Sequence, residues 1–266
     1  RKLHDVTAAV ETYRRLLELE PGHEDTVAAL ERLLDHPDHD LVLAEILDPV
    51  YRTRSDFGNL VRVLEIQARH TLDMRRKIDL LHEIATACED GLDDPARAYE
   101  ALGRALAEDP LDPETTRRLE RLAKALGRCD DLVVRYRAAA ETLQSDESKG
   151  AVYHAIAKLA EHELGNSEIA AAAYKQALAV GPRDLEAADA LEAIYIRAAD
   201  YGQLVLLLQR KMEMVDALAD KKELGSRAAK IWEEVLDDSE QAIEVYRQVL
   251  ALDDSNETAL DSLVRL

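Results

Sequence analysis

The chain has 266 residues, of which 54 are acidic and 34 are basic, so its formal net charge is −20 at neutral pH. This negative charge repels phosphate backbones and anionic lipid surfaces, so nucleic acid and membrane surfaces are poor general partners. The 10 glycines and 7 prolines are too few for the turns of an all-β chain, and no apolar run approaches the ~20 residues that span a bilayer. We therefore expect a soluble all-α chain without membrane insertion, and its two cysteines suit a reducing, cytoplasmic compartment.

The sequence matches itself at a 72-residue shift from about residue 40 onward, and we call this shift the repeat period. Small and apolar side chains recur at the repeat period, as in Ala85, Ala157 and Ala229; Leu92, Leu164 and Leu236; Ala98, Ala170 and Ala242; Leu106, Leu178 and Leu250; Leu60, Leu132 and Leu204; and Leu47, Leu119, Leu191 and Leu263. A fixed period predicts stacked helical repeats, in which each hairpin covers the apolar stripe of its neighbour.

The first elements in chain order follow the same pattern at a different shift. An 89-residue shift pairs Ala9, Tyr13, Leu16 and Pro21 with Ala98, Leu102, Ala105 and Pro110. The excess over the repeat period is the length of one helix with its turn. We therefore expect an extra helix between Pro21 and Asp40.

Each 72-residue unit contains four stretches of helical length with apolar residues at i, i+3, i+4 and i+7. In one unit the predicted helices are 94–108, 112–126, 129–145 and 148–164, with Asp94, Asp112 and Asp130 as candidate N-caps. Pro110 and Pro182 sit just after helices, which they cannot continue. Over the whole chain the pattern predicts about fifteen helices, joined by short connections and therefore antiparallel to their neighbours.

Half of each unit resembles a tetratricopeptide repeat (TPR). Small and aromatic residues stand where the family places them in three copies: Ala229, Trp232, Ala242, Tyr246, Val249 and Asp254; Ala157, Ala160, Ala170, Tyr174, Ala177 and Pro182; and Ala85, Cys88, Ala98, Leu102, Ala105 and Pro110. The other half is a looser match that keeps Leu191, Tyr195, Asp200, Tyr201, Leu204 and Leu208 in register. The half-units have about 35 and 37 residues against 34 in the family, so the resemblance is to an expanded variant with a 72-residue double-hairpin period.

The resemblance implies a right-handed superhelical solenoid of antiparallel hairpins that covers residues 1–266 as a single array. The chain starts without Met and stops at Leu266, within what earlier copies continue as a helix. We therefore expect a fragment of a longer protein, from which a targeting signal could have been removed.

Clusters that could carry chemistry have simpler structural explanations. The run from Asp35 to Asp40 holds two histidines and is the densest cluster of potential metal ligands. It lies at a predicted inter-helix turn, where Asp and Pro are expected, and its residues are adjacent rather than spaced to converge, so we expect a turn and no metal site. Cys88 and Cys129 align with packing positions and suit inert core thiols rather than nucleophiles. Aromatic residues on the apolar stripes suit the core better than a ligand site; they are Tyr13, Tyr99, Tyr136, Tyr153, Tyr174, Tyr246 and Trp232. No catalytic motif and no cofactor motif is present, so we expect no enzyme and no cofactor.

In the TPR family the first helix of each hairpin lines a concave surface that holds peptides or proteins. The corresponding outward-facing residues here are Arg52, His82, Arg117, Arg121, Lys124, His154, Lys158, Glu161, Asp189, Arg197, Lys230 and Glu233. Arg117, Arg121 and Lys124 occur at i, i+4 and i+7, which places three cations on one helix face.

This basic stripe, to which Lys158 of the next such helix is added, has two interpretations. It could capture a carboxylate-rich segment or the C-terminal carboxylate of a partner through charge-assisted hydrogen bonds. Alternatively, its cations pair with acids such as Glu114, Glu120 and Glu161 on a solvated surface, where each pair contributes only ~0–1 kcal/mol.

Three functions remain open. The protein could be a non-catalytic scaffold or adaptor that binds a partner protein or peptide, with self-association possible. It could be a sensor or regulatory segment of a larger multidomain protein whose catalytic part lies elsewhere. An enzyme would need a convergent polar pocket, which the repeat does not predict.

Overall fold

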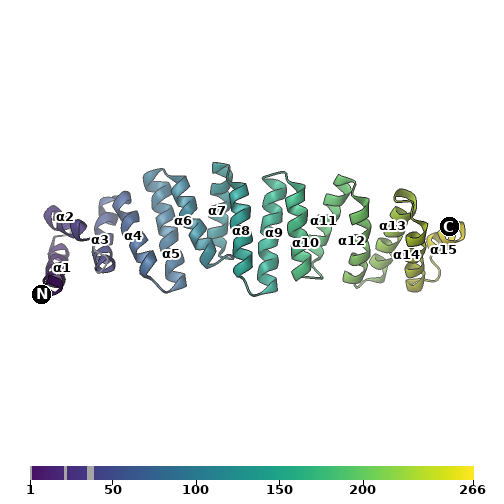
Figure 1. Cartoon of the computed structure of the whole chain (residues 1–266), viewed down its shortest axis with the longest axis horizontal. Helices are drawn as coiled ribbons and strands as arrows, with labels where there is room; N and C mark the ends of the chain where they lie inside the picture. Colours follow the sequence, from purple (N-terminus) through teal and green to yellow (C-terminus); the bar gives the residue numbers. More distant parts are fainter. Residues whose placement is uncertain (1, 21–22, 35–38) are drawn as a thin grey trace. The chain divides into compact units, whose positions relative to one another are not determined.

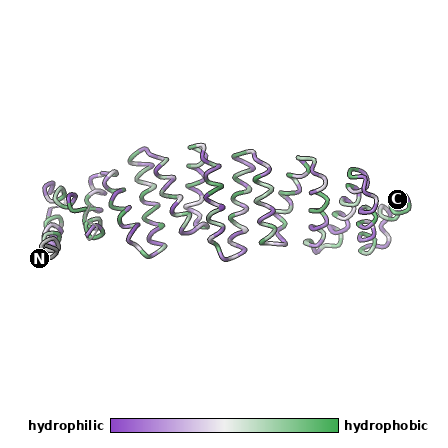
Figure 2. The backbone as a smooth tube through the Cα atoms, in the orientation of Figure 1, coloured by the Kyte–Doolittle hydropathy of each residue, from purple (hydrophilic) through white to green (hydrophobic). Residues whose placement is uncertain are grey.

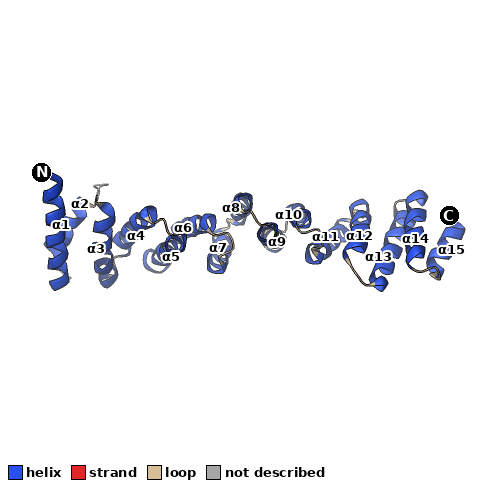
Figure 3. Ribbon diagram, turned by 90° about the horizontal axis from the view of Figure 1, so that it is seen from below, coloured by secondary structure: helices blue, strands red, loops and turns tan. Residues whose placement is uncertain are grey.

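The structure is a computed structural model, and it describes residues 2–20, 23–34 and 39–266. These residues form fifteen α-helices, two of which continue into a short π-helical segment, and they contain no strand (Figure 3). The predictions of an all-α chain and of about fifteen helices are confirmed. None of the helices in these ranges combines the length and the apolar character that crossing a bilayer requires.

The chain divides into two compact units, residues 1–135 and 136–266, and the division falls inside α8. The helices that lie in the first unit or begin there are α1 (Lys2–Leu19), α2 (Glu24–Leu33), α3 (Asp40–Arg54), α4 (Phe57–His70), α5 (Met74–Thr86), its π-helical extension η1 (Ala87–Gly91), α6 (Pro95–Glu108), α7 (Pro113–Leu126) and α8 (Cys129–Thr142). From α3 to α7 each helix packs against the next (Figure 1).

Within the second unit, too, successive helices pack against one another. Its helices are α9 (Asp146–His162), α10 (Ser167–Val180), α11 (Leu185–Ala198), α12 (Tyr201–Met214), α13 (Leu218–Lys230), its π-helical extension η2 (Ile231–Val235), α14 (Ser239–Leu252) and α15 (Glu257–Arg265). Each packs against the next from α9 to α15. The single array and its right-handed superhelix stay predictions.

Helix starts follow the capping residues, with one correction. The extra helix expected before Asp40 is α2, and the carboxylates of Asp94 and Asp112 accept hydrogen bonds from the backbone N–H groups of Arg97 and Thr115, as N-caps do. Asp130 is not a cap, because α8 begins one residue earlier at Cys129 and places Asp130 in its first turn.

The connection between α8 and α9 also differs from the prediction. Helix α8 ends at Thr142 rather than at residue 145, and α9 begins at Asp146 rather than at residue 148. Ser145 caps α9, since its hydroxyl accepts a hydrogen bond from the Ser148 backbone N–H. This cap fixes the start of α9 two residues earlier than the apolar pattern suggests.

Left-handed backbone marks the turns at regular positions. The described residues with positive φ fall into two series, Ser55, Gly127 and Ala199, and Asp93, Gly165 and Asp237. Members of the first series directly follow α3, α7 and α11, where a left-handed residue ends a helix; members of the second precede α6, α10 and α14. Successive members of each series are one repeat period apart.

The core is formed where the apolar stripes of adjacent helices pack against each other. Hydrophobic and hydrophilic residues alternate along the helices in Figure 2. Ala98, Ala170 and Ala242 are fully buried, as expected for positions where helices approach closely. The core prediction is confirmed for the buried Tyr99, Tyr136, Tyr174 and Tyr246, whereas Tyr13, Tyr153 and Trp232 are half-buried. Cys88 and Cys129 are buried and form no disulfide, and burial raises the pKa of Cys88, so packing describes Cys88 better than reactivity.

Candidate functional site

All twelve residues predicted for a binding surface lie on odd-numbered helices or on the extension of one. Arg52 and His82 belong to α3 and α5 of the first unit, and Arg117, Arg121 and Lys124 belong to its α7. The others belong to α9, α11, α13 and η2 of the second unit. Side chains of these helices reach one another past the even-numbered helix between them. We call the surface they form within each unit the odd-helix face.

In the first unit, Arg52 connects α3 to α5. Its guanidinium binds Asp48 on its own helix and Glu83 on α5. These bonds raise the pKa of Arg52, and its side chain is 45% exposed. Arg52 is thus a bridge between two helices rather than a cation without a counter-ion.

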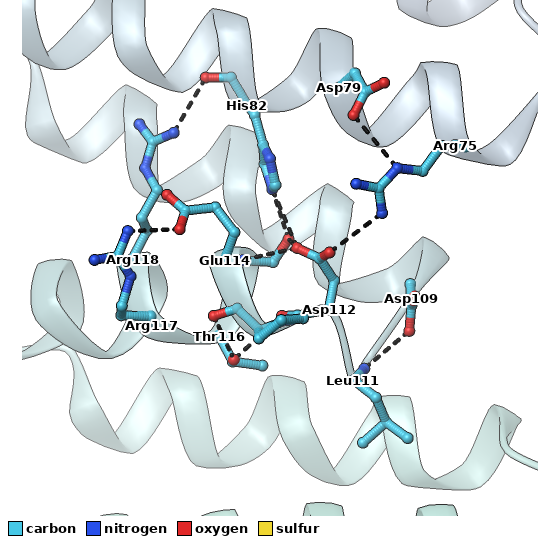
Figure 4. A network of polar contacts seen from close by, with 12 residues as sticks. Arg75, Asp79, His82, Asp109, Leu111, Asp112, Glu114, Thr116, Arg117 and Arg118 are labelled. Carbon is cyan, nitrogen blue, oxygen red and sulfur yellow. Dashed lines mark hydrogen bonds and ion pairs between the residues drawn. The ribbon is translucent and has the colours of Figure 1, made fainter.

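His82 connects α5 to the start of α7 (Figure 4). The Thr115 hydroxyl donates to Asp112 Oδ2 at 2.8 Å, so its lone pairs are left for His82 Nε2, 2.7 Å away. This geometry assigns the Nε2–H tautomer to His82. Burial lowers the pKa of His82, an effect that the nearby Asp112 partly opposes and Arg118 reinforces. The imidazole therefore favours the neutral form.

Glu89 in η1 organises the cations of α7. Arg118 Nη2 lies 2.8 Å from Glu89 Oε1, and Arg121 binds the other carboxylate oxygen. Although burial opposes ionisation, these two hydrogen bonds lower the pKa of Glu89. The Arg118 side chain is 13% exposed and the Arg121 side chain is 58% exposed. The exposed guanidinium of Arg121 therefore shares Glu89 with the more buried guanidinium of Arg118.

The basic stripe is therefore partly neutralised by acids. Arg117 pairs with Glu114 on its own helix, as Figure 4 shows, and Arg121 pairs with Glu89. In the second unit Lys158 lies 2.9 Å from Glu186. These three cations therefore pair with neighbouring acids, as the second interpretation of the basic stripe predicts. Glu114 is one of the acids that this interpretation names.

In the second unit, two further contacts join α9 to the start and the end of α11. His154 Nε2 lies 2.6 Å from Asp184, the residue that caps α11, and its ring packs edge-on against Tyr174 with centroids 5.7 Å apart. Glu161 binds the Arg197 guanidinium. Both contacts have counterparts in the first unit. There His82 lies near Asp112, which caps α7, and Glu89 binds Arg121 of α7.

A buried lysine joins three helices of the same unit. Lys211 on α12 is 9% exposed and binds Asp189 and Glu192 of α11, and Glu192 also accepts a hydrogen bond from Arg227 of α13. Burial acts against both ions, but the hydrogen bonds lower the pKa of Glu192 and raise that of Lys211. Asp189 is 67% exposed, which leaves it at the surface of this cluster.

The last two predicted residues lie near the end of α13. Glu233 in η2 accepts a hydrogen bond from the Tyr246 hydroxyl at 3.0 Å and binds Arg265 of α15. Lys230, the last residue of α13, is exposed. Glu89, Glu161 and Glu233 follow one another at the repeat period, and each binds an arginine of the next odd-numbered helix.

Sequence reasoning missed Glu89, Arg118, Lys211 and Arg227. Glu89 could have been found, because it lies one repeat period before Glu161, which was selected. Arg118 and Lys211 could not, since their positions read as part of the buried stripe and nothing in the repeat indicates a charge there. Arg118 pairs with an acid 29 positions away in sequence, and Lys211 pairs with one that is 19 positions away.

The candidate metal cluster lies mostly outside the described residues, which omit 35–38. Of its members, Asp40 begins α3 and lies 3.0 Å from His70, while His39 directly precedes the helix. Within the part of the chain that the structure describes, no group of three or more histidine, cysteine, aspartate or glutamate side chains is arranged to hold a metal ion.

No family model matches the sequence, and no curated protein matches it. The chain is similar in structure to the C-terminal part of a TPR repeat-containing protein from Cytophaga hutchinsonii, with 12% identity, a TM-score of 0.38, and coverage of 95% of this chain and 98% of that one. It is also similar to PilF of Pseudomonas aeruginosa, with 15% identity, a TM-score of 0.35, and coverage of 86% and 99%.

A third similar structure is a signal-transduction ATPase with numerous domains and a tetratricopeptide repeat sensor, from Pyrococcus horikoshii. The identity is 14% and the TM-score 0.34, and the match covers 95% of this chain and 43% of that one. Identities this low concern the fold alone and say nothing about partners.

Proposed function

We propose that the chain is a non-catalytic scaffold that binds a partner protein or peptide on its odd-helix face, with the expanded TPR-like double hairpin as its repeating unit. The left-handed positions recur at the repeat period, and so do Glu89, Glu161 and Glu233, which supports that unit. Cys88 and Cys129 are buried and form no disulfide, which fits a reducing compartment such as the cytoplasm.

The observation that carries the proposal is the set of polar contacts that joins odd-numbered helices within each unit. Arg52 and His82 join α3, α5 and α7 in the first unit, and Glu161 and Glu233 join odd helices of the second. Side chains held by such contacts lose little further conformational freedom when a partner binds, so the surface is pre-organised for recognition.

Arg121 is the strongest anchor for an acidic segment in the first unit. It is 58% exposed and shares Glu89 with the less exposed Arg118, so two guanidiniums face one carboxylate there. Because Arg118 keeps Glu89 paired, a carboxylate of a partner can take up the donors of the exposed Arg121 without leaving Glu89 unpaired. In the second unit the corresponding anchor is Lys158, which is 55% exposed.

Fluorescence anisotropy with a fluorescein-labelled hexaglutamate peptide tests this proposal. Hydrogen bonds to charged groups contribute about 1.5–3 kcal/mol, so we expect Arg121→Glu or Lys158→Glu to weaken binding by roughly 10-fold or more. Arg247→Glu is the matched control, because Arg247 is exposed on the even-numbered helix α14. Equal affinities of the three variants and the unchanged protein would remove the odd-helix face as the binding surface.

The alternative, a sensor or regulatory segment of a larger protein, uses the same surface. It differs in what the array is attached to, and the two are distinguished by the sequence of the gene on either side of these residues.

A further inference from the structure

We propose a second binding site, a groove between α10 and α12 that accepts an apolar side chain next to a carboxylate, from an acidic segment of a partner protein. The groove has a volume of about 170 Å³ and lies wholly within the second unit. Its main lining residues are Lys175 and Leu178 of α10, Tyr195 of α11, and Gln203, Leu206 and Arg210 of α12.

The floor of this groove is apolar. Leu178 and Tyr195 are buried, with 2% and 6% exposure, whereas Leu206 at the rim is 55% exposed. An apolar cavity of about 150 Å³ admits a benzene molecule, so this volume suits one leucine or phenylalanine side chain. Covering Leu206 as well would remove further apolar surface from water, which favours binding.

The rim of the groove is cationic. Among the described residues that line it, Lys175 and Arg210 carry positive charge and none carries a carboxylate. In a chain with a net charge of −20 this is a local reversal of sign. It differs from the odd-helix face, where Arg117, Arg121 and Lys158 each meet an acid.

Both cations are held in place by contacts that leave hydrogen-bond donors for a ligand. Arg210 Nη2 donates to the Leu178 carbonyl oxygen at 2.7 Å, which uses one of the five N–H groups of the guanidinium. Lys175 Nζ lies 5.6 Å from the centroid of the Tyr195 ring, within the range of a cation–π contact. A carboxylate that enters beside the apolar side chain would therefore find two cations already oriented.

The groove is separate from the odd-helix face. On α11, Leu191 and Tyr195 reach the groove, while Asp189 binds Lys211. A helix turns by about 100° per residue, so Leu191 and Tyr195 point to the side of α11 opposite to Asp189. The site does not rest on the proposed function of the odd-helix face, and a partner could occupy either surface alone.

The test is fluorescence anisotropy of the full chain with a fluorescein-labelled hexapeptide of alternating leucine and glutamate. We expect Lys175→Glu and Leu206→Ser each to weaken its binding at least tenfold. Replacing leucine by alanine in the peptide should have the same effect, because the apolar side chain is lost. Arg247→Glu is the control, since it changes the net charge equally at an exposed position on α14, outside both the groove and the odd-helix face.

Lys175 and Leu206 are exposed, so their variants should fold, and circular dichroism melting verifies this. Unchanged binding in both variants, or no binding of the peptide at millimolar concentration, overturns the site. If Arg121→Glu or Lys158→Glu weakens binding instead, the peptide occupies the odd-helix face, which overturns the groove but supports the proposed function.

Discussion

Asp189 and Lys211 form an ion pair in which Nζ lies 2.6 Å from Oδ1, although the Lys211 side chain is only 9% exposed. The same ammonium binds Glu192, which is 13% exposed and is also bound by Arg227. Removal of one partner from a buried pair is costly, because the other charge stays out of water. Lys211 therefore stabilises the second unit chiefly by neutralising Glu192.

Lys211→Met tests this role. We expect the free energy of unfolding to fall by about 1–3 kcal/mol, since Glu192 keeps only Arg227 as a counter-ion. Urea denaturation followed by circular dichroism measures the change. Lys221→Met on α13 is the control, being a less buried lysine in the same unit. Equal denaturation midpoints for the two variants would show that the buried pair contributes nothing.

The pKa shift of His82 predicts a dependence of stability on pH. Burial lowers its pKa in the folded state, so between that value and the ordinary one near 6.5 the unfolded state binds more protons. Stability therefore falls as the pH is lowered from about 7.5 to about 5.5. His82→Gln keeps a donor to Thr115 without a titrating ring, and its melting temperature should fall less over this interval. An identical fall in the two proteins would contradict the assignment.

Ala170 tests the close approach of helices in a hairpin. It is fully buried at the start of α10, and a leucine there should overpack the contact at a cost of roughly 1–3 kcal/mol. Ala172→Leu is the matched control, because Ala172 is exposed on the same helix. Thermal melting should separate the two variants by several degrees, and an unchanged midpoint for Ala170→Leu would count against the hairpin.

Ala199 adopts left-handed backbone at the end of α11, with φ of 52°, where the position one repeat period earlier has Gly127. The left-handed conformation costs a side chain with a Cβ roughly 1–2 kcal/mol, which glycine avoids although it loses more entropy on folding. We expect Ala199→Gly to raise stability by about 0.5 kcal/mol and Gly127→Ala to lower it by a similar amount. Chemical denaturation measures the free energy of unfolding of both variants. Changes of the same sign in the two would refute this account.

The helices could be predicted from the sequence because their determinants are local and repeated. Asp94 and Asp112 cap the helices expected of them, and the shift of the N-terminal pattern revealed α2. Ala98 and Ala170 are buried where the repeat places them. Asp130 was misassigned as a cap because α8 starts with the adjacent Cys129, and an acidic residue in the first turn looks the same in sequence as one at the cap.

The charge pairing of the candidate site could not be predicted in the same way. Helical spacing correctly grouped Arg117 and Arg121 on α7, but Arg121 meets Glu89, a residue of η1 that is 32 positions away. Which acid a long side chain reaches depends on the offset between two packed helices and on its rotamer. The sequence pattern encodes neither of these quantities.

The left-handed residues Gly127 and Ala199 have a consequence for protein engineering. A segment from residue 128 to 199 begins after one such position and ends at the next, so both of its ends meet the same backbone conformation. We expect that duplicating this segment in the gene would add four helices without altering a turn. The number of helices could then be changed in steps of four.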